Sequence, residues 1–86
     1  MDFKHELISA LSDTKSGIQA PMFDLDQLPN GRVSGFLISP TFIGKDQIDR
    51  QKKLWDYLEK VFPREKTRKI AVLVTITPEE AKEDDE

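Results

Sequence analysis

The basic side chains that could contact phosphate lie close together near the start of one predicted helix. They are Lys45, Arg50, Lys52 and Lys53. Lysine and arginine bind nucleic-acid backbones by neutralising phosphates, normally from one shared surface. On a helix that turns about 100° per residue, the three residues at 50, 52 and 53 point in three directions. Acidic residues are also interleaved with them, so the pattern favours a solvated helix surface with paired charges over a phosphate site.

Two further side chains of the same helix are candidates for contact with a partner. Gln51 falls in the middle of the apolar stripe, where a buried amide nearly always finds a hydrogen-bond partner. The favoured interpretation is that this amide bonds to backbone, and the alternative is a contact with a partner. Tyr57 lies on the polar side and stays open as a contact residue. The candidate contact residues are therefore Lys45, Arg50, Gln51, Lys52, Lys53 and Tyr57.

No set of residues in the sequence is typical of a catalytic or metal site. The chain has no cysteine, and His5 is its one histidine, so a thiolate or imidazole cluster cannot form. Ser39 has neither a histidine near it in sequence nor nucleophile-elbow glycines. Asp24 and Asp26 alternate along a predicted strand, which indicates a solvated face. We therefore expect no enzyme activity, no catalytic or metal-binding residue and no cofactor.

The composition limits the size and class of the protein. The chain has 86 residues and a formal net charge of −3, which predicts one domain with a modest core and speaks against general nucleic-acid affinity. It has neither a run of about 18 apolar residues nor the features of a signal peptide. We expect no membrane association, a cytoplasmic location, one domain over residues 1–81 and an acidic flexible tail over 82–86.

One helix, expected over Ile48–Phe62, organises the rest of the chain. Asp46 is a good N-cap residue, and Pro63 ends the helix because the residue before a proline avoids helical geometry. The apolar positions recur at the helical spacing of three and four residues. This stripe comprises Ile48, Leu54, Trp55, Leu58, Val61 and Phe62.

The dipeptide Asn30-Gly31 predicts a tight β-hairpin between two strand-like runs. A two-residue type I′ turn needs positive φ at both central positions, and Asn-Gly is its commonest sequence. This turn would pair Pro29 with Arg32 and Leu28 with Val33. Further along it would pair Leu25 with Phe36 and Phe23 with Ile38, so these four side chains would share one face. Asp24 and Asp26 would then lie on the opposite, solvated face.

The remaining elements complete an α-β-β-α-α-β order. A first helix is expected over Asp2–Leu11, a compact turn or short helix over Ser39–Lys45, and a charged loop over Arg64–Lys69. Lys69–Thr77 is a strand with two apolar faces, which is typical of a central or covered strand. Thr77-Pro78-Glu79-Glu80 has the spacing of a capping box and begins a short helix. The expected fold is α/β (α+β), a single three-stranded mixed sheet with the helices on one face.

In this order, three segments resemble the BolA family, which has a class II KH-like fold. The first runs from Phe36 to Lys45 and contains Ser39 and the sequence Phe42-Ile43-Gly44-Lys45. The second is Arg50-Gln51-Lys52 followed by Trp55, at the place of the family's helix motif. The third runs from Ala71 to Glu80 and ends in Thr-Pro-Glu-Glu. The resemblance covers more than half of the chain, from Val33 to about Ala81.

The resemblance implies a regulatory role but not the family's cluster chemistry. The family's helix histidine, a ligand for an iron–sulfur cluster shared with a monothiol glutaredoxin, corresponds to Gln51. The second family ligand lies on a longer loop, which here is replaced by the tight turn at Asn30-Gly31. We therefore expect the isolated chain to bind no iron–sulfur cluster, because an amide is a poor iron ligand.

The function expected from the sequence is that of a small non-enzymatic regulatory or adaptor protein that acts through a protein partner. The alternative is a nucleic-acid-binding module of the transcriptional regulator type, which would use the basic residues at the start of the main helix. A small enzyme or ligand-binding protein is the least favoured, because a thin two-layer domain of this length leaves little room for a pocket.

Overall fold

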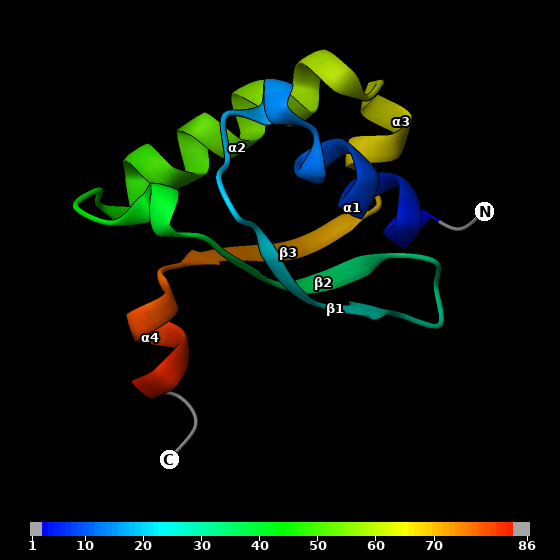
Figure 1. Ribbon diagram of the computed structural model, residues 1–86. Helices are drawn as coiled ribbons and strands as arrows, with labels where there is room; N and C mark the ends of the chain where they lie inside the picture. Colours follow the sequence, from blue (N-terminus) through cyan, green and yellow to red (C-terminus); the bar gives the residue numbers. More distant parts are fainter. Residues whose placement is uncertain (1–2, 84–86) are drawn as a thin grey trace.

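The structure, a computed structural model, describes residues 3–83 and confirms the predicted α/β organisation (Figure 1). Three helices, α1, α2 and α3, lie on one face of a three-stranded sheet, while α4 leaves the end of β3 on the other side. The elements are α1 (Phe3–Ser12), the 3-10 turn η1 (Thr14–Ser16), β1 (Met22–Gln27), β2 (Val33–Ile38), the 3-10 turn η2 (Pro40–Phe42), α2 (Gln47–Val61), α3 (Arg64–Thr67), β3 (Ile70–Ile76) and α4 (Pro78–Glu83).

Most predicted boundaries agree with these elements. The side chain of Asp46 caps α2 by accepting a hydrogen bond from the backbone N–H of Asp49 (2.9 Å), and Phe62 ends the helix before a proline. The predicted charged loop after α2 contains a short helix, α3, which begins directly after Pro63. Asp2 of the predicted first helix and residues 84–86 of the predicted tail lie outside the described residues.

The sheet has the strand order β1-β2-β3. β1 pairs with β2 in antiparallel orientation and β2 pairs with β3 in parallel, as predicted. The interpretation of β3 as a central or fully covered strand is wrong, because β3 forms one edge of the sheet and leaves Val72 56% exposed. Its second apolar face therefore belongs to the surface of the protein.

The predicted register of the hairpin is wrong by one residue. Leu28 pairs with Arg32 through a hydrogen bond from its N–H to the Arg32 carbonyl (2.7 Å), so the loop has three residues rather than two. Gly31 has a φ of 85°, whereas Asn30 does not have a positive φ. The prediction of a two-residue turn did not take Pro29 into account. The fixed φ of this proline suits the first central position of a type I turn. A type I turn followed by a left-handed glycine gives a three-residue hairpin loop.

This shift moves two large side chains of β2 to the opposite face of the sheet. In the observed register Phe23 pairs with Leu37, and Asp24 pairs with Phe36. Because side chains alternate along a strand, a one-residue slip exchanges the faces of the whole strand. Phe36 and Ile38 therefore lie on the outer face with Asp24, and not with Phe23 as predicted.

The core lies between the inner face of the sheet and the helices. Leu54 and Leu58 of α2 are fully buried, and Trp55 packs against the core while half-buried. Ile48 is 79% exposed and Val61 is 43% exposed, so the predicted stripe is wrong at these two positions, whereas Phe62 packs against the core as predicted. The buried residues of α2 are Arg50, Leu54 and Leu58, which are four residues apart. Arg50 therefore takes the buried position in the first turn that was predicted for Ile48. The core comprises Phe3, Leu7, Leu11, Ile18, Leu25, Val33, Leu37, Phe42, Leu54, Leu58, Ile70 and Leu73.

Gly35 of β2 provides a test of this packing. Its φ is 146°, and a Cβ atom at this position would lie 2.0 Å from the carbonyl oxygen of Asp24. We expect Gly35→Ala to lower the free energy of unfolding by more than about 1 kcal/mol, since backbone must move to admit the methyl group. Gly44→Ala is the control, because its φ is also positive but nothing lies within 4 Å of the added atom. Equal losses in urea unfolding of the two variants would contradict the clash.

Candidate functional site

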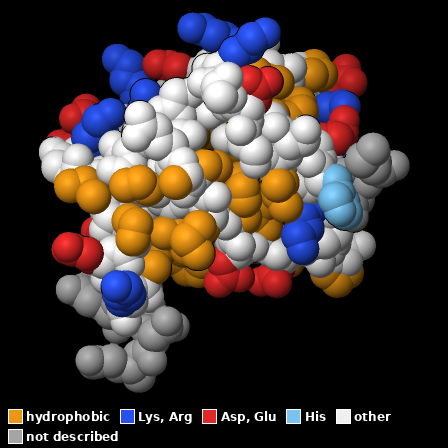
Figure 2. Space-filling model, viewed as in Figure 1, with side chains coloured by type: hydrophobic (Ala, Val, Ile, Leu, Met, Phe, Trp, Pro, Cys, Tyr) orange, Lys and Arg blue, Asp and Glu red, His pale blue; other side chains and the backbone are white. Residues whose placement is uncertain are grey.

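The face of the sheet that points away from α1, α2 and α3 is largely apolar. Figure 2 shows hydrophobic side chains gathered over the strands beside α4. Met22 is 61% exposed, Val72 56% and Phe36 37%. The strand pairing arranges this outer face in three rows of three residues. From the α4 end they are Met22, Ile38 and Ile76, then Asp24, Phe36 and Val74, and then Asp26, Ser34 and Val72.

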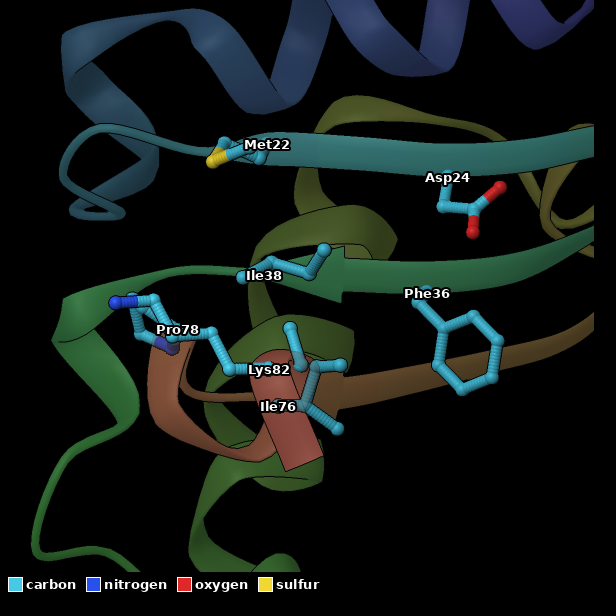
Figure 3. A pocket seen from close by; sticks show the side chains of 8 residues that line it. Met22, Asp24, Phe36, Ile38, Ile76, Pro78 and Lys82 are labelled. Atoms are coloured by element: carbon cyan, nitrogen blue, oxygen red, sulfur yellow. The ribbon is translucent and has the colours of Figure 1, made fainter. Parts of the chain in front are cut away.

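A groove of about 690 Å³ lies where this outer face meets α4. Figure 3 shows strand side chains on one side of it and the side chains of Pro78 and Lys82 on the other. Among the described residues that line it, Asp24 and Lys82 are the charged ones. We call this the sheet groove, and it is lined by Met22, Asp24, Phe36, Ile38, Ile76, Pro78, Ala81 and Lys82.

The wall formed by α4 is held in place by a capping box and an ion pair. The N–H of Thr77 donates to Oε1 of Glu80 (2.7 Å), and the N–H of Glu80 donates to Oγ1 of Thr77 (3.2 Å). This confirms the predicted capping box. Oε1 of Glu80 also accepts a hydrogen bond from Nη1 of Arg50 (2.8 Å). A helix as short as α4 is not stable alone, so these contacts determine which side of α4 faces the groove.

Arg50 lies inside the protein, although it was a candidate for contact with a partner. The residue is only 7% exposed. Its Nε donates to the carbonyl of Lys45 (2.8 Å), and its Nη1 donates to the carbonyl of Thr75 (3.2 Å) and to Glu80. The guanidinium group therefore joins the start of α2, the end of β3 and α4.

The amide of Gln51 has the structural role that the sequence favoured. Its Nε2 donates to the carbonyl of Leu73 (3.0 Å) and to Oγ1 of Thr75 (3.2 Å), while its Oε1 accepts from Nε1 of Trp55 (3.2 Å). Gln47 adds a bond from its Nε2 to the carbonyl of Thr75 (3.0 Å). These carbonyls point to the free edge of β3, since the alternate carbonyl of Ile76 bonds to Ser39 on the β2 side.

The other predicted contact residues do not form one surface with these two. Lys45 and Lys52 are exposed, and Lys53 is half-buried. Tyr57 packs against the core, and its hydroxyl donates to the carbonyl of Ala10 in α1 (2.8 Å). Burial raises the pKa of Tyr57, with a further contribution from the negative charge of Asp13. The position of Tyr57 thus serves the contact between α1 and α2.

The residues of the sheet groove were missed in the sequence because the register error placed Phe36 and Ile38 inside the core. The proline before Asn30-Gly31 was the available signal for the longer loop.

Ser39, which had been weighed as a nucleophile, is fully buried and donates to the carbonyl of Gln19 (2.6 Å). Among residues 3–83, no group of three or more His, Cys, Asp or Glu side chains is placed to hold a metal ion. In the same range no helix has the length and apolar character needed to cross a membrane.

Known proteins add no further information about this site. No protein-family model, curated protein or solved structure matches the chain. The resemblance to the BolA family therefore rests on the sequence motifs alone.

The buried guanidinium of Arg50 predicts a large effect of its removal. Arg50→Met keeps much of the volume but leaves the carbonyls of Lys45 and Thr75 without this donor. We expect the free energy of unfolding to fall by about 3 kcal/mol, since hydrogen bonds to charged groups are each worth roughly 1.5–3 kcal/mol. Lys52→Met on the exposed side of α2 should change it by less than about 0.5 kcal/mol. Similar unfolding midpoints for the two variants would contradict this role.

Glu80 should make the stability of the protein depend on pH. Hydrogen bonds from the Thr77 backbone and from Arg50 lower the pKa of Glu80 below its ordinary value of 4.5. The ionised form is therefore favoured in the folded state, and its stabilisation is present above that value and is lost as the pH falls through the lowered pKa. Urea unfolding from pH 7 to pH 3 should show a shallower loss for Glu80→Gln than for the wild type. Glu79→Gln, on the exposed side of α4, should retain the wild-type dependence, and a shallower loss in this control would contradict the assignment.

Proposed function

We propose that the protein is a small non-enzymatic regulatory or adaptor protein that acts through a protein partner bound in the sheet groove. The observation that carries this proposal is the concave apolar surface between β1, β2, β3 and α4. Contiguous exposed apolar surface bordered by charged groups is typical of protein interaction sites. The proposed regulatory role rests on the sequence motifs that resemble the BolA family. The proposed cytoplasmic location rests on the sequence, in which we found no long apolar run and no signal-peptide features.

The chemistry of the groove supports binding rather than catalysis. Within residues 3–83, the charged groups that line it are one carboxylate, Asp24, and one amine, Lys82, and the other lining residues are apolar. Catalytic sites need a nucleophile or a general base held within hydrogen-bond reach of further polar groups. An apolar groove with charges at its border instead suits the side chains of a protein surface.

The alternative function, nucleic-acid binding at the start of α2, has less support. Three oxygens of the protein already engage Arg50, which leaves Lys45, Lys52 and Lys53 as candidate phosphate contacts. Asp46 and Asp49 are exposed among these lysines, and acidic side chains weaken attraction to phosphate. The alternative predicts a complex with DNA or RNA whose affinity falls steeply as salt increases.

Affinity capture with matched variants tests the proposed function. The wild type, Phe36→Asp and Ile43→Asp would each be tagged and used to capture proteins from the native host. Phe36 lies in the groove, whereas Ile43 is 62% exposed in the turn before α2. We expect a protein retained by the wild type and by Ile43→Asp but lost with Phe36→Asp. If Phe36→Asp retains the same proteins, the groove is not the contact surface, and capture of nucleic acid that is lost at higher salt would favour the alternative.

A further inference from the structure

We propose that the partner in the sheet groove is a second copy of this chain. Two copies would stack their outer sheet faces about a two-fold axis that crosses the strands near Phe36. This inference rests on the proposed function, because it uses the same surface and names what covers it. Sheets that pack face to face lie about 10 Å apart with their side chains in contact, and the sheet groove would supply one half of such an interface.

The two ends of the outer face differ in a way that fits this axis. At one end, Pro78 and Ala81 of α4 stand beside the row of Met22, Ile38 and Ile76. At the other end the last row holds Val72, which is 56% exposed. A two-fold axis across the strands exchanges the ends, so α4 of each copy would cover Val72 of the other. In this arrangement, the exposed end of each sheet is covered by α4 of the other copy.

The charges select the same orientation. Lys82 belongs to the α4 end of the face, and Asp26 belongs to the row at the opposite end. Exchange of the ends brings Lys82 of each copy toward Asp26 of the other, and symmetry makes this contact twice. An axis parallel to the strands would instead put both α4 helices at one end, with Lys82 facing Lys82. Opposite charges at an interface fix register and suppress such alternatives.

The size of the face suggests a dimer that depends on concentration. Three strands of six or seven residues cover about 14 Å by 20 Å, and α4 extends this area at one end in each copy. Two such faces amount to about 560 Å² before α4 is added, and the whole interface stays below the roughly 1,200 Å² that stable complexes bury, in the range of weak and transient complexes. The core of each copy is complete without the outer face, so the single chain should fold alone and associate by mass action.

Sedimentation equilibrium of the purified chain tests the dimer. As concentration rises about a hundredfold, the mass of the wild type should increase from 9.9 kDa toward twice that value. Phe36→Asp and Val72→Lys should both remain at the mass of one chain, while circular dichroism shows that each still folds. Ile43→Asp, on an exposed apolar residue outside the groove, should still dimerise. A wild type that stays monomeric, or a Phe36→Asp variant that still dimerises, would overturn the proposal.

A charge exchange tests the orientation. Asp26→Lys and Lys82→Glu should each weaken the dimer about tenfold or more, since each variant brings two like-charged pairs together across the two-fold axis. The double variant restores opposite charges and should recover most of the lost affinity. If the double variant dimerises no better than the single variants, the proposed orientation is wrong.

The same variants separate this inference from the proposed function. A monomeric wild type that still captures a protein through Phe36 would overturn the dimer alone. A dimer disrupted by Phe36→Asp, together with capture that this substitution does not change, would overturn the groove as the site of the proposed function and leave the dimer standing.

Discussion

The buried guanidinium group of Arg50 is the interaction on which the arrangement of this small domain depends. A buried cation is costly unless oxygen atoms surround it, and here two carbonyls and the carboxylate of Glu80 do so. These oxygens come from the loop before α2, from β3 and from α4. Satisfying one charge therefore requires three separate segments to be in place. Among the described residues, no buried side-chain nitrogen or oxygen lacks a hydrogen-bond partner.

Local signals in the sequence predicted the elements and their order well. Asp46 and Pro63 set the limits of α2, and Thr77 with Glu80 formed the expected capping box. Such signals act over three or four residues, so they can be seen in the sequence without knowing the fold. The order of the elements, with a crossover through α2 between β2 and β3, also predicted a mixed sheet with helices on one face, which is where α1, α2 and α3 lie (Figure 1).

The hairpin register and the burial of Arg50 could not be predicted in the same way. Asn30-Gly31 satisfies both a two-residue and a three-residue loop, and Pro29 decides between them through its fixed φ. That single choice determines which side of the sheet Phe36 occupies. The hydrogen-bond partners of Arg50 are harder to predict than the loop length, because Thr75 and Glu80 lie 25 and 30 residues further along the chain. The sheet groove depends on both features, and it was therefore not apparent in the sequence.

The amide side chains along the edge of β3 bear on the solubility of the protein. Ile70–Ile76 is uncharged, contains no proline and is rich in β-branched residues, which is the composition of segments that stack into amyloid. In the folded chain, Gln47 and Gln51 occupy carbonyls that an incoming strand would otherwise use. Edge protection in this protein is thus provided by a helix and not by charges on the strand itself. Any transient opening that lifts α2 from the sheet would expose an aggregation-prone strand, so the docking of one helix also protects against misassembly.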